Sequence, residues 1–282
     1  MPGGPDPLYV RARATLLNAA DALAEQLDAV VLVGAQAVYL HAGSADFAVA
    51  DHTTDADFCV APSDLSDKPL LAESLEARGF SLREHPGAWI SPDGIPVDIM
   101  VPEALAGAGS RGARLGAHGT KAARRAKGLE GALVDRARMT IASLDPADDR
   151  AIAMFVAGPA ALLVAKVHKI AERTGTGDRV SDKDALDVLR LLRATDTATL
   201  ADGLVQLSAH DLSAAVTTEA VTQLALLFGT SEAKGIAMAV RAARPNAEAE
   251  VISASFVALV SDLLTATGGR KGTQSPFPQT AT

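Results

Sequence analysis

The pattern of apolar residues changes near residue 158, and this change constrains the fold more than any other feature of the chain. Before it, short apolar runs alternate with stretches of helical periodicity, a pattern typical of helices packed on a sheet. After it, helical spacing continues alone to about residue 267. We therefore predict an α+β fold, with a mixed-sheet domain over residues 1–150, a helical C-terminal domain over 151–267 and a disordered tail over 268–282.

Strand and helix signals follow one another closely in the first hundred residues. A helix is expected over residues 11–27, a strand over 29–33 that ends at Gly34, and a second helix over 35–41. Further strands are expected over residues 55–60, 80–84, 88–91 and 97–101, with a helix over 70–78. In the second part of the chain, helices are expected from residue 159, over 182–193, and at three or more places between 197 and 267.

The composition is that of a soluble globular protein and limits several classes of function. Of the 282 residues, 48% are hydrophobic and 21% are charged, which is an ordinary balance. The single cysteine, Cys59, excludes an internal disulfide and a cysteine-based zinc site, and it suits a reducing cytoplasm. The N-terminus has no apolar signal-peptide core, and no uninterrupted apolar run reaches the length of about 18 residues that spans a membrane. We therefore expect a cytoplasmic protein with no membrane partner.

A glycine stands where the first predicted strand meets the second predicted helix, in the run Val33-Gly34-Ala35. Backbone amides at the start of a helix are unpaired and lie at the positive end of its dipole, so they can bind a phosphate group. Glycine is also the usual residue of a tight turn, and a turn without a ligand is the simpler interpretation.

Three aspartates on predicted strands are the candidates for metal chemistry. Asp55 and Asp57 are two residues apart, so their side chains point to one face of a strand, where a cation would offset their repulsion. Asp98 lies inside an apolar run and needs a partner if it is buried. On a neighbouring strand, Asp98 would complete a cluster able to hold one or two Mg²⁺ ions, or would act as a general base. The alternative is that all three carboxylates face water.

In its order of elements, this part of the chain resembles the nucleotidyltransferase superfamily. The matching residues are Gly34-Ala35 and Thr54-Asp55-Ala56-Asp57, followed by Asp98 on a later strand. Ala35 departs from the family pattern, where serine is common, and a hydroxyl contact to phosphate is lost there. The resemblance implies an NTP substrate, a Mg²⁺ cofactor held by Asp55, Asp57 and Asp98, and nucleotide contacts at Gly34, Ala35 and Thr54.

The second part of the chain extends the resemblance to the AbiEii-type, or MenT-type, bacterial toxin nucleotidyltransferases. The matching residues are Lys166 on one helix and Lys183, Asp184 and Asp187 on the next, so that the resemblance covers about residues 28–194. It implies that Lys166 contacts NTP phosphate, that Lys183, Asp184 and Asp187 belong to the nucleotide site, and that an antitoxin protein is a candidate partner. The NTP would lie between the two domains.

These residues also have ordinary structural interpretations. Lys166, Lys169 and Arg173 follow helical spacing and could form one solvated face. Lys183, Asp184 and Asp187 could be surface pairs along a helix. His168 could be a packed or surface histidine.

Residues 110–138 form a basic segment within an acidic protein. It carries eight basic residues against Glu130 and Asp135, whereas the whole chain has a net charge of −8. The basic residues are Arg111, Arg114, Lys121, Arg124, Arg125, Lys127, Arg136 and Arg138. Such a segment can bind an RNA acceptor through its phosphates, or it can be a solvated loop that pairs with the acidic remainder. Few aromatic residues accompany it, so base stacking is not expected.

The sequence thus predicts a Mg²⁺-dependent nucleotidyltransferase that moves a nucleotide from an NTP to an acceptor hydroxyl, with RNA as one candidate acceptor. Two alternatives stay open. One is a small-molecule nucleotidyltransferase that acts on an antibiotic or a metabolite. The other is a nucleotide-binding protein of the same fold without catalysis, which the loss of the serine at Ala35 would favour.

Overall fold

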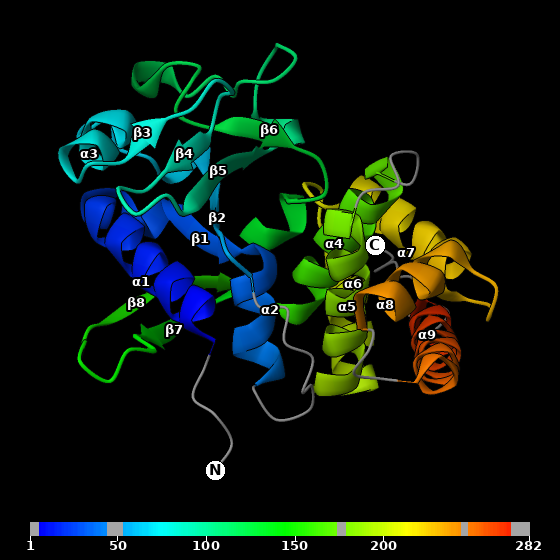
Figure 1. Cartoon of the computed structure of the whole chain (residues 1–282). Coiled ribbons are helices and arrows are strands. Elements are labelled where there is room, and N and C mark those ends of the chain that lie inside the picture. The colour runs from blue at the N-terminus through cyan, green and yellow to red at the C-terminus, as the bar shows by residue number, and fades with distance from the viewer. Residues whose placement is uncertain (1–5, 44–52, 174–178, 244–247, 272–282) are drawn as a thin grey trace, which may run out of the picture.

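The computed structural model describes residues 6–43, 53–173, 179–243 and 248–271. It confirms the α+β class, because a mixed eight-stranded sheet is followed by a run of helices. Figure 1 shows the two parts side by side, with the sheet and helices α1–α3 in one half and helices α4–α9 in the other. Helix α2 (Gly34–Ala42) lies between them and contacts both α4 (Pro159–Arg173) and α5 (Arg179–Ala194).

The sheet contains both parallel and antiparallel strand pairs. The strand order is β3 (Ser81–Leu82), β4 (Ala88–Ile90), β5 (Pro96–Pro102), β2 (Ala56–Val60), β1 (Val30–Val33), β8 (Ala151–Ala157) and β7 (Arg136–Ala142), with β6 (Arg124–Ala126) paired to β5. Strand β1 is buried along its whole length, as its continuous apolar run predicts. It runs antiparallel to β2 and parallel to β8, while β2 and β5 are parallel.

The first helix begins and ends earlier than the sequence analysis predicted. Helix α1 covers Pro7–Ala22, and a 3₁₀ helix over Ala24–Ala29 follows it. Asp6 caps α1, because its carboxylate accepts a hydrogen bond from the Leu8 amide at 2.7 Å. An aspartate followed by proline is a common helix start, and this signal precedes the apolar periodicity on which the prediction relied. Helix α3 covers Leu71–Ala77, close to the predicted range.

The sheet does not end at residue 150. Strands β7 and β8 pair along their whole length, from Arg136 with Ala157 to Ala142 with Ala151, so the predicted boundary falls inside a hairpin. Residues 151–157 therefore belong to the sheet, and the helical part begins at α4. Strand β7 was not predicted because its charged residues resemble a loop. In the structure, the guanidinium groups of Arg136 and Arg138 lie 4.4 and 4.8 Å from the ring centroid of Phe155 on β8.

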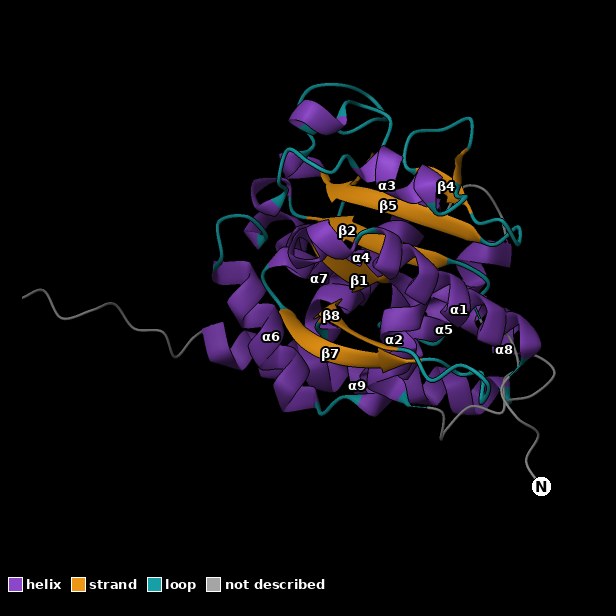
Figure 2. Cartoon of the chain, turned by 90° about the vertical axis from the view of Figure 1, so that its left-hand side faces the viewer, coloured by secondary structure: helices purple, strands orange, loops and turns teal. Residues whose placement is uncertain are grey.

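The helical part contains α4, α5, α6 (Thr197–Ala209), α7 (Ala214–Phe228), α8 (Lys234–Ala243) and α9 (Ala249–Lys271). Figure 2 shows these helices behind the sheet in the turned view. Phe228 and Phe256 stack with ring centroids 4.7 Å apart, and so join α7 to α9 in the core. The predicted tail begins later than expected, since residues 268–271 belong to α9, and residues 272–282 lie outside the described residues.

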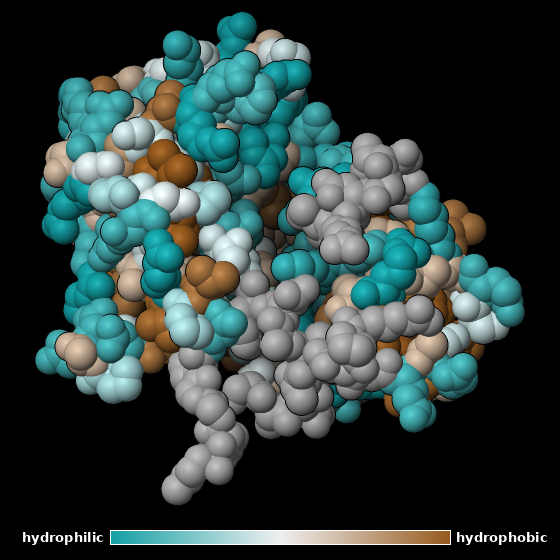
Figure 3. All heavy atoms as spheres, viewed as in Figure 1, coloured by the Kyte–Doolittle hydropathy of each residue, from teal (hydrophilic) through white to brown (hydrophobic). Residues whose placement is uncertain are grey.

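Helix α9 is the one helix of the described residues that is long and apolar enough to cross a membrane. Its window Ala249–Gly269 has a mean hydropathy of 1.6, and 28% of that window is buried. Core helices of soluble proteins pass the same test. One side of α9 does belong to the core, where Ile252, Phe256 and Val260 are buried. The face of the molecule drawn in Figure 3 is largely hydrophilic, with hydrophobic side chains scattered over it.

Candidate functional site

The three aspartates lie on, or directly before, two neighbouring interior strands of the sheet, β2 and β5. Asp57 is opposite Asp98 in the parallel pairing of β2 with β5, so both side chains point to the same face. Asp55 lies two residues before Asp57, immediately ahead of β2. On the other side of Asp57 is β1, whose last residue Val33 is its antiparallel partner. Asp57 and Asp98 are thus cross-strand neighbours, and Asp55 lies just before Asp57 in the sequence.

Gly34 forms the turn from β1 into α2 directly beside Asp57. Its φ angle is +70°, a conformation that side chains other than glycine rarely adopt. A methyl group on Gly34 would lie 2.0 Å from Asp57 Oδ2, which is shorter than any allowed contact. Glycine is required here both by the turn and by the close approach of the Asp57 carboxylate.

The pKa of Asp57 is raised well above the ordinary value for an aspartate. Burial, together with the neighbouring carboxylates of Asp55 and Asp98, raises the pKa of Asp57 to about 7, against the opposing effect of Lys169 and Lys166. Close carboxylates disfavour one another's ionised form, and a cation between them would remove that penalty. Thr53 donates a hydrogen bond from its hydroxyl to Asp55 Oδ1, which holds that side chain at the start of the strand.

Asp98 already has a cationic partner within the protein. Arg124 on β6 donates from Nη2 to Asp98 Oδ2 at 3.0 Å, and both side chains are 34% exposed. In the part of the chain that the structure describes, no group of three Asp, Glu, His or Cys side chains is arranged to hold a metal ion. The predicted three-carboxylate cage is therefore not formed as it stands. Mg²⁺ is usually held by one or two carboxylates together with substrate phosphates, and Asp55 and Asp57 fit that mode.

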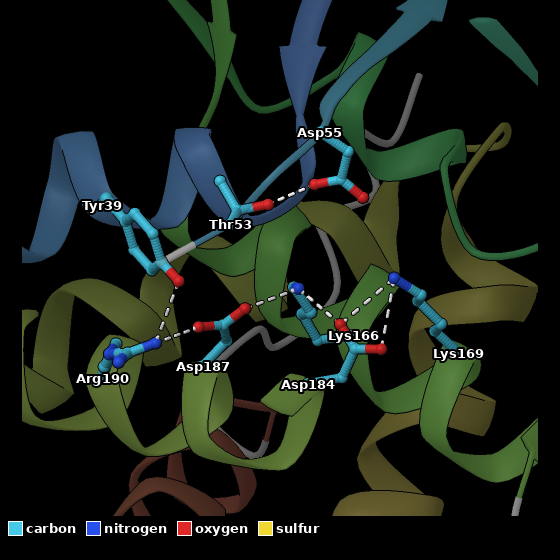
Figure 4. A network of polar contacts seen from close by, with 8 residues as sticks. All are labelled: Tyr39, Thr53, Asp55, Lys166, Lys169, Asp184, Asp187 and Arg190. Carbon is cyan, nitrogen blue, oxygen red and sulfur yellow. Dashed lines mark hydrogen bonds and ion pairs between the residues drawn. The ribbon is translucent and has the colours of Figure 1, made fainter. Parts of the chain in front are cut away.

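A buried network of charges lies on the facing helices α4 and α5. Lys166 Nζ donates to Asp184 Oδ1 at 2.6 Å and to Asp187 Oδ2 at 2.7 Å, and its side chain is 4% exposed. Burial acts to lower the pKa of Lys166, but the two carboxylates hold it above its ordinary value. Figure 4 shows the network, with Thr53 and Asp55 drawn above Lys166 and Lys169. Lys166 is thus a buried supporting cation with two of its three donors in use.

Lys169 is the more accessible cation of this network. Its ammonium lies 3.2 Å from Asp184 Oδ2, and 36% of its side chain is exposed. The ammonium of Lys169 lowers the pKa of Asp57 more than that of Lys166 does, so Lys169 interacts electrostatically with the aspartates. The sequence analysis assigned the phosphate contact to Lys166 and named Lys169 only as a member of a possible solvated helix face. The spacing of three residues between them was the available signal, since both lie on one side of the helix.

Arg190 connects the network to the sheet half. Its Nη1 donates to Asp187 Oδ1 at 2.6 Å and to the Tyr39 hydroxyl at 3.3 Å, and its guanidinium lies 4.9 Å from the centroid of the Tyr39 ring. Tyr39 belongs to α2, the helix that begins at Gly34. Burial raises the pKa of the Tyr39 phenol, and Asp187 raises it further, so the phenol stays neutral. Neither Tyr39 nor Arg190 was predicted, because neither belongs to a short motif.

The remaining predicted contacts lie nearer the surface. Thr54 and Lys183 are exposed, and Ala35 is partly exposed at the first turn of α2. Asp184 is almost fully buried; burial acts to raise its pKa, but the ammonium groups of Lys166 and Lys169 keep it below the ordinary value. Residues 44–52, which connect α2 to Thr53, lie outside the described residues.

Most of the basic segment is paired with carboxylates. The pairs are Arg124 with Asp98, Arg125 with Glu103, Lys127 with Glu219, Arg136 with Asp64, and Arg138 with Asp28. These five follow the interpretation of a segment that pairs with the acidic remainder. Arg111, Arg114 and Lys121 are exposed, and they form no salt bridge in the described residues.

Comparison with protein family models, with curated proteins and with solved structures found no match for this chain. The nucleotidyltransferase resemblance therefore remains a prediction from the residues themselves. What the structure adds is their arrangement: two carboxylates at the start of β2, a third in register with Asp57, a glycine turn beside Asp57, and a partly exposed lysine on α4.

Proposed function

We propose that this protein is a Mg²⁺-dependent nucleotidyltransferase that moves a nucleotide from an NTP to an acceptor hydroxyl. The observation that carries the proposal is the register of Asp57 with Asp98, beside Asp55 and directly over the Gly34 turn. Carboxylates that share one sheet face and raise the pKa of one member are typical of functional sites.

Different residues would bind the metal ion and the triphosphate. Asp55 and Asp57 would hold Mg²⁺, which when bound supplies positive charge for the triphosphate. The amides that follow Gly34 and the ammonium of Lys169 would bind phosphate oxygens from opposite sides. Lys166 joins α4 to α5 through Asp184 and Asp187, and Lys169 lies close enough to Asp57 to lower its pKa.

Asp98 is the candidate base for the acceptor hydroxyl. It is held by Arg124 through one oxygen, Oδ2, and the side chain is partly exposed, so the other oxygen can accept a proton from a hydroxyl. The nucleophile would then attack the α-phosphorus, and pyrophosphate would leave.

Two features bear on the acceptor. Arg111, Arg114 and Lys121 are exposed and lie outside the salt bridges of the segment, which supports a polyanionic acceptor such as RNA. A small antibiotic or metabolite is the alternative acceptor, favoured by the internal pairing of the other five basic residues.

The test is transfer of label from each of the four α-³²P-labelled NTPs in the presence of Mg²⁺, with total RNA or a small-molecule panel as acceptor. We expect one NTP to label one class of acceptor, with release of pyrophosphate, and we expect Asp57→Asn to abolish the label. Absence of both transfer and Mg²⁺-dependent NTP binding would refute the proposal. NTP binding without transfer to any acceptor would favour the non-catalytic alternative.

A further inference from the structure

Asp55 lies just outside the strand that carries Asp57. Strand β2 begins at Ala56, and its pairing with β1 ends at Asp57, so the Asp55 carbonyl needs a partner from elsewhere. The partner is a side chain: Gln36 Nε2 on the first turn of α2 donates to the Asp55 carbonyl at 2.8 Å. The second hydrogen of the same amide goes to the Ala12 carbonyl on α1 at 3.1 Å. The Gln36 amide thus replaces the hydrogen bond that a neighbouring strand would supply.

Arg13 fixes the orientation of Gln36. Arg13 Nε donates to Gln36 Oε1 at 2.9 Å, so the oxygen of the amide must face Arg13 and the nitrogen must face Asp55. Gln36 is 1% exposed and Arg13 is 4% exposed. Arg13 also donates from Nη1 to the Ala142 carbonyl at 3.1 Å and from Nη2 to the Tyr9 hydroxyl at 3.0 Å.

Burying Arg13 and Gln36 in this way costs more free energy than the stability of the fold alone would require. Among the described residues, the acceptors that Arg13 uses are all neutral, although a buried cation is best offset by a carboxylate. Apolar side chains of the same size would fill the space between α1 and α2 at lower cost. What they could not do is hold the Asp55 carbonyl.

We propose that Gln36, oriented by Arg13, is a positioning residue that holds Asp55 where it can bind a divalent cation. The role in cation binding rests on the proposed function, whereas the anchoring of Asp55 can be measured without any assay of activity. Groups that orient a metal ligand commonly change metal affinity by about ten- to a hundredfold when they are removed.

The chain offers a matched control for Gln36. Gln26 is also buried, and its Nε2 donates to two carbonyls, those of Ser66 at 2.8 Å and Pro69 at 2.9 Å. It holds the loop that precedes α3, and none of its partners belongs to the aspartate cluster. Substitution of either glutamine by methionine keeps a side chain of similar size and removes two hydrogen bonds from a buried amide to backbone carbonyls.

The experiment compares Gln36→Met with Gln26→Met at a temperature where both variants are folded. Hydrogen exchange at the amides of residues 54–57 should become about tenfold faster in Gln36→Met and should not change in Gln26→Met. The dissociation constant for Mn²⁺, used as a paramagnetic probe, should rise about tenfold in Gln36→Met alone. Arg13→Met should reproduce both effects more weakly, because the amide keeps its carbonyl partners but loses its fixed orientation.

The readouts separate the two ways in which the reasoning can fail. Unchanged exchange at residues 54–57 in Gln36→Met overturns the anchor, whatever the activity. Faster exchange with unchanged Mn²⁺ affinity overturns the positioning role and leaves Gln36 a structural residue. If the unsubstituted protein binds no Mn²⁺ and transfers no nucleotide, the proposed function fails, and the positioning role fails with it even where exchange shows that Gln36 anchors Asp55.

Discussion

Asp57→Asn should stabilise the protein in the absence of metal, and the gain should grow with pH. The pKa of Asp57 is raised from 3.8 to about 7 by burial and by Asp55 and Asp98, so the folded state disfavours its charge. A group whose pKa is raised on folding supports the folded state most below its unfolded pKa, and this support is lost as pH rises through the folded pKa. The loss therefore falls between about pH 4 and pH 7, and asparagine avoids it.

The magnitude follows from the size of the shift. A rise of about three units at 1.36 kcal/mol per unit sets an upper limit of about 4 kcal/mol. The titration of Asp57 is coupled to that of the two neighbouring carboxylates. Neutralising Asp57 alone should therefore raise the free energy of unfolding by only part of this limit, about 1–2 kcal/mol. For a chain of this length, that is a rise in Tm of about 2–6 °C at pH 8.

The assay is thermal or urea unfolding in EDTA at pH 5 and pH 8, with Asp67→Asn as the control, since Asp67 is an exposed aspartate outside the cluster. At pH 5 the gap between Asp57→Asn and the parent should be roughly half of that at pH 8. Saturating Mg²⁺ should reverse the order by stabilising the parent alone. If Asp57→Asn is less stable than the parent at pH 8 without metal, the three carboxylates do not repel one another as described.

Three further outcomes follow from the same contacts. Gly34→Ala should cost about 2–4 kcal/mol, measured by urea unfolding, because the residue has a positive φ and its methyl group would meet Asp57; a neutral result would show that the turn can relax. Lys166→Met should cost about 3 kcal/mol in the same assay, since it leaves Asp184 and Asp187 short of a buried partner. Lys169→Ala should cost less than about 1 kcal/mol of stability but weaken NTP binding about tenfold by calorimetry; equal NTP affinity would return Lys169 to the solvated face.

The segment from β1 to β2 could be predicted from local signals. A continuous apolar run, a glycine and an amphipathic stretch indicated β1, the turn at Gly34 and α2, and alternation indicated β2. The sequence could suggest that Asp98 lies on a strand next to that of Asp57, but it could not establish the register of the two residues. Strand order depends on pairings between distant parts of the chain. The three aspartates could therefore be named as candidates from the sequence, but their arrangement could not be derived from it.

Other parts of the site carry no local signal. Lys166 and Lys169 have the same spacing as any solvated pair, and what separates them is the burial of Lys166 between Asp184 and Asp187. Gln36 resembles an ordinary helix residue in the sequence, and its partners come from α1 and from the residue before β2. Strand β7 was missed because its arginines are polar in the sequence but lie over Phe155 in the structure.

The parallel pairing of β8 with β1 has a consequence for how the protein is made. Strand β1 emerges early from the ribosome, yet the strand that covers one of its edges is among the last of the sheet to be synthesised. Until residue 157 is available, a nascent chain exposes that apolar edge, which is a template for pairing with other chains. A fragment that stops at residue 150 should aggregate for the same reason, whereas a fragment that includes β8 closes the sheet.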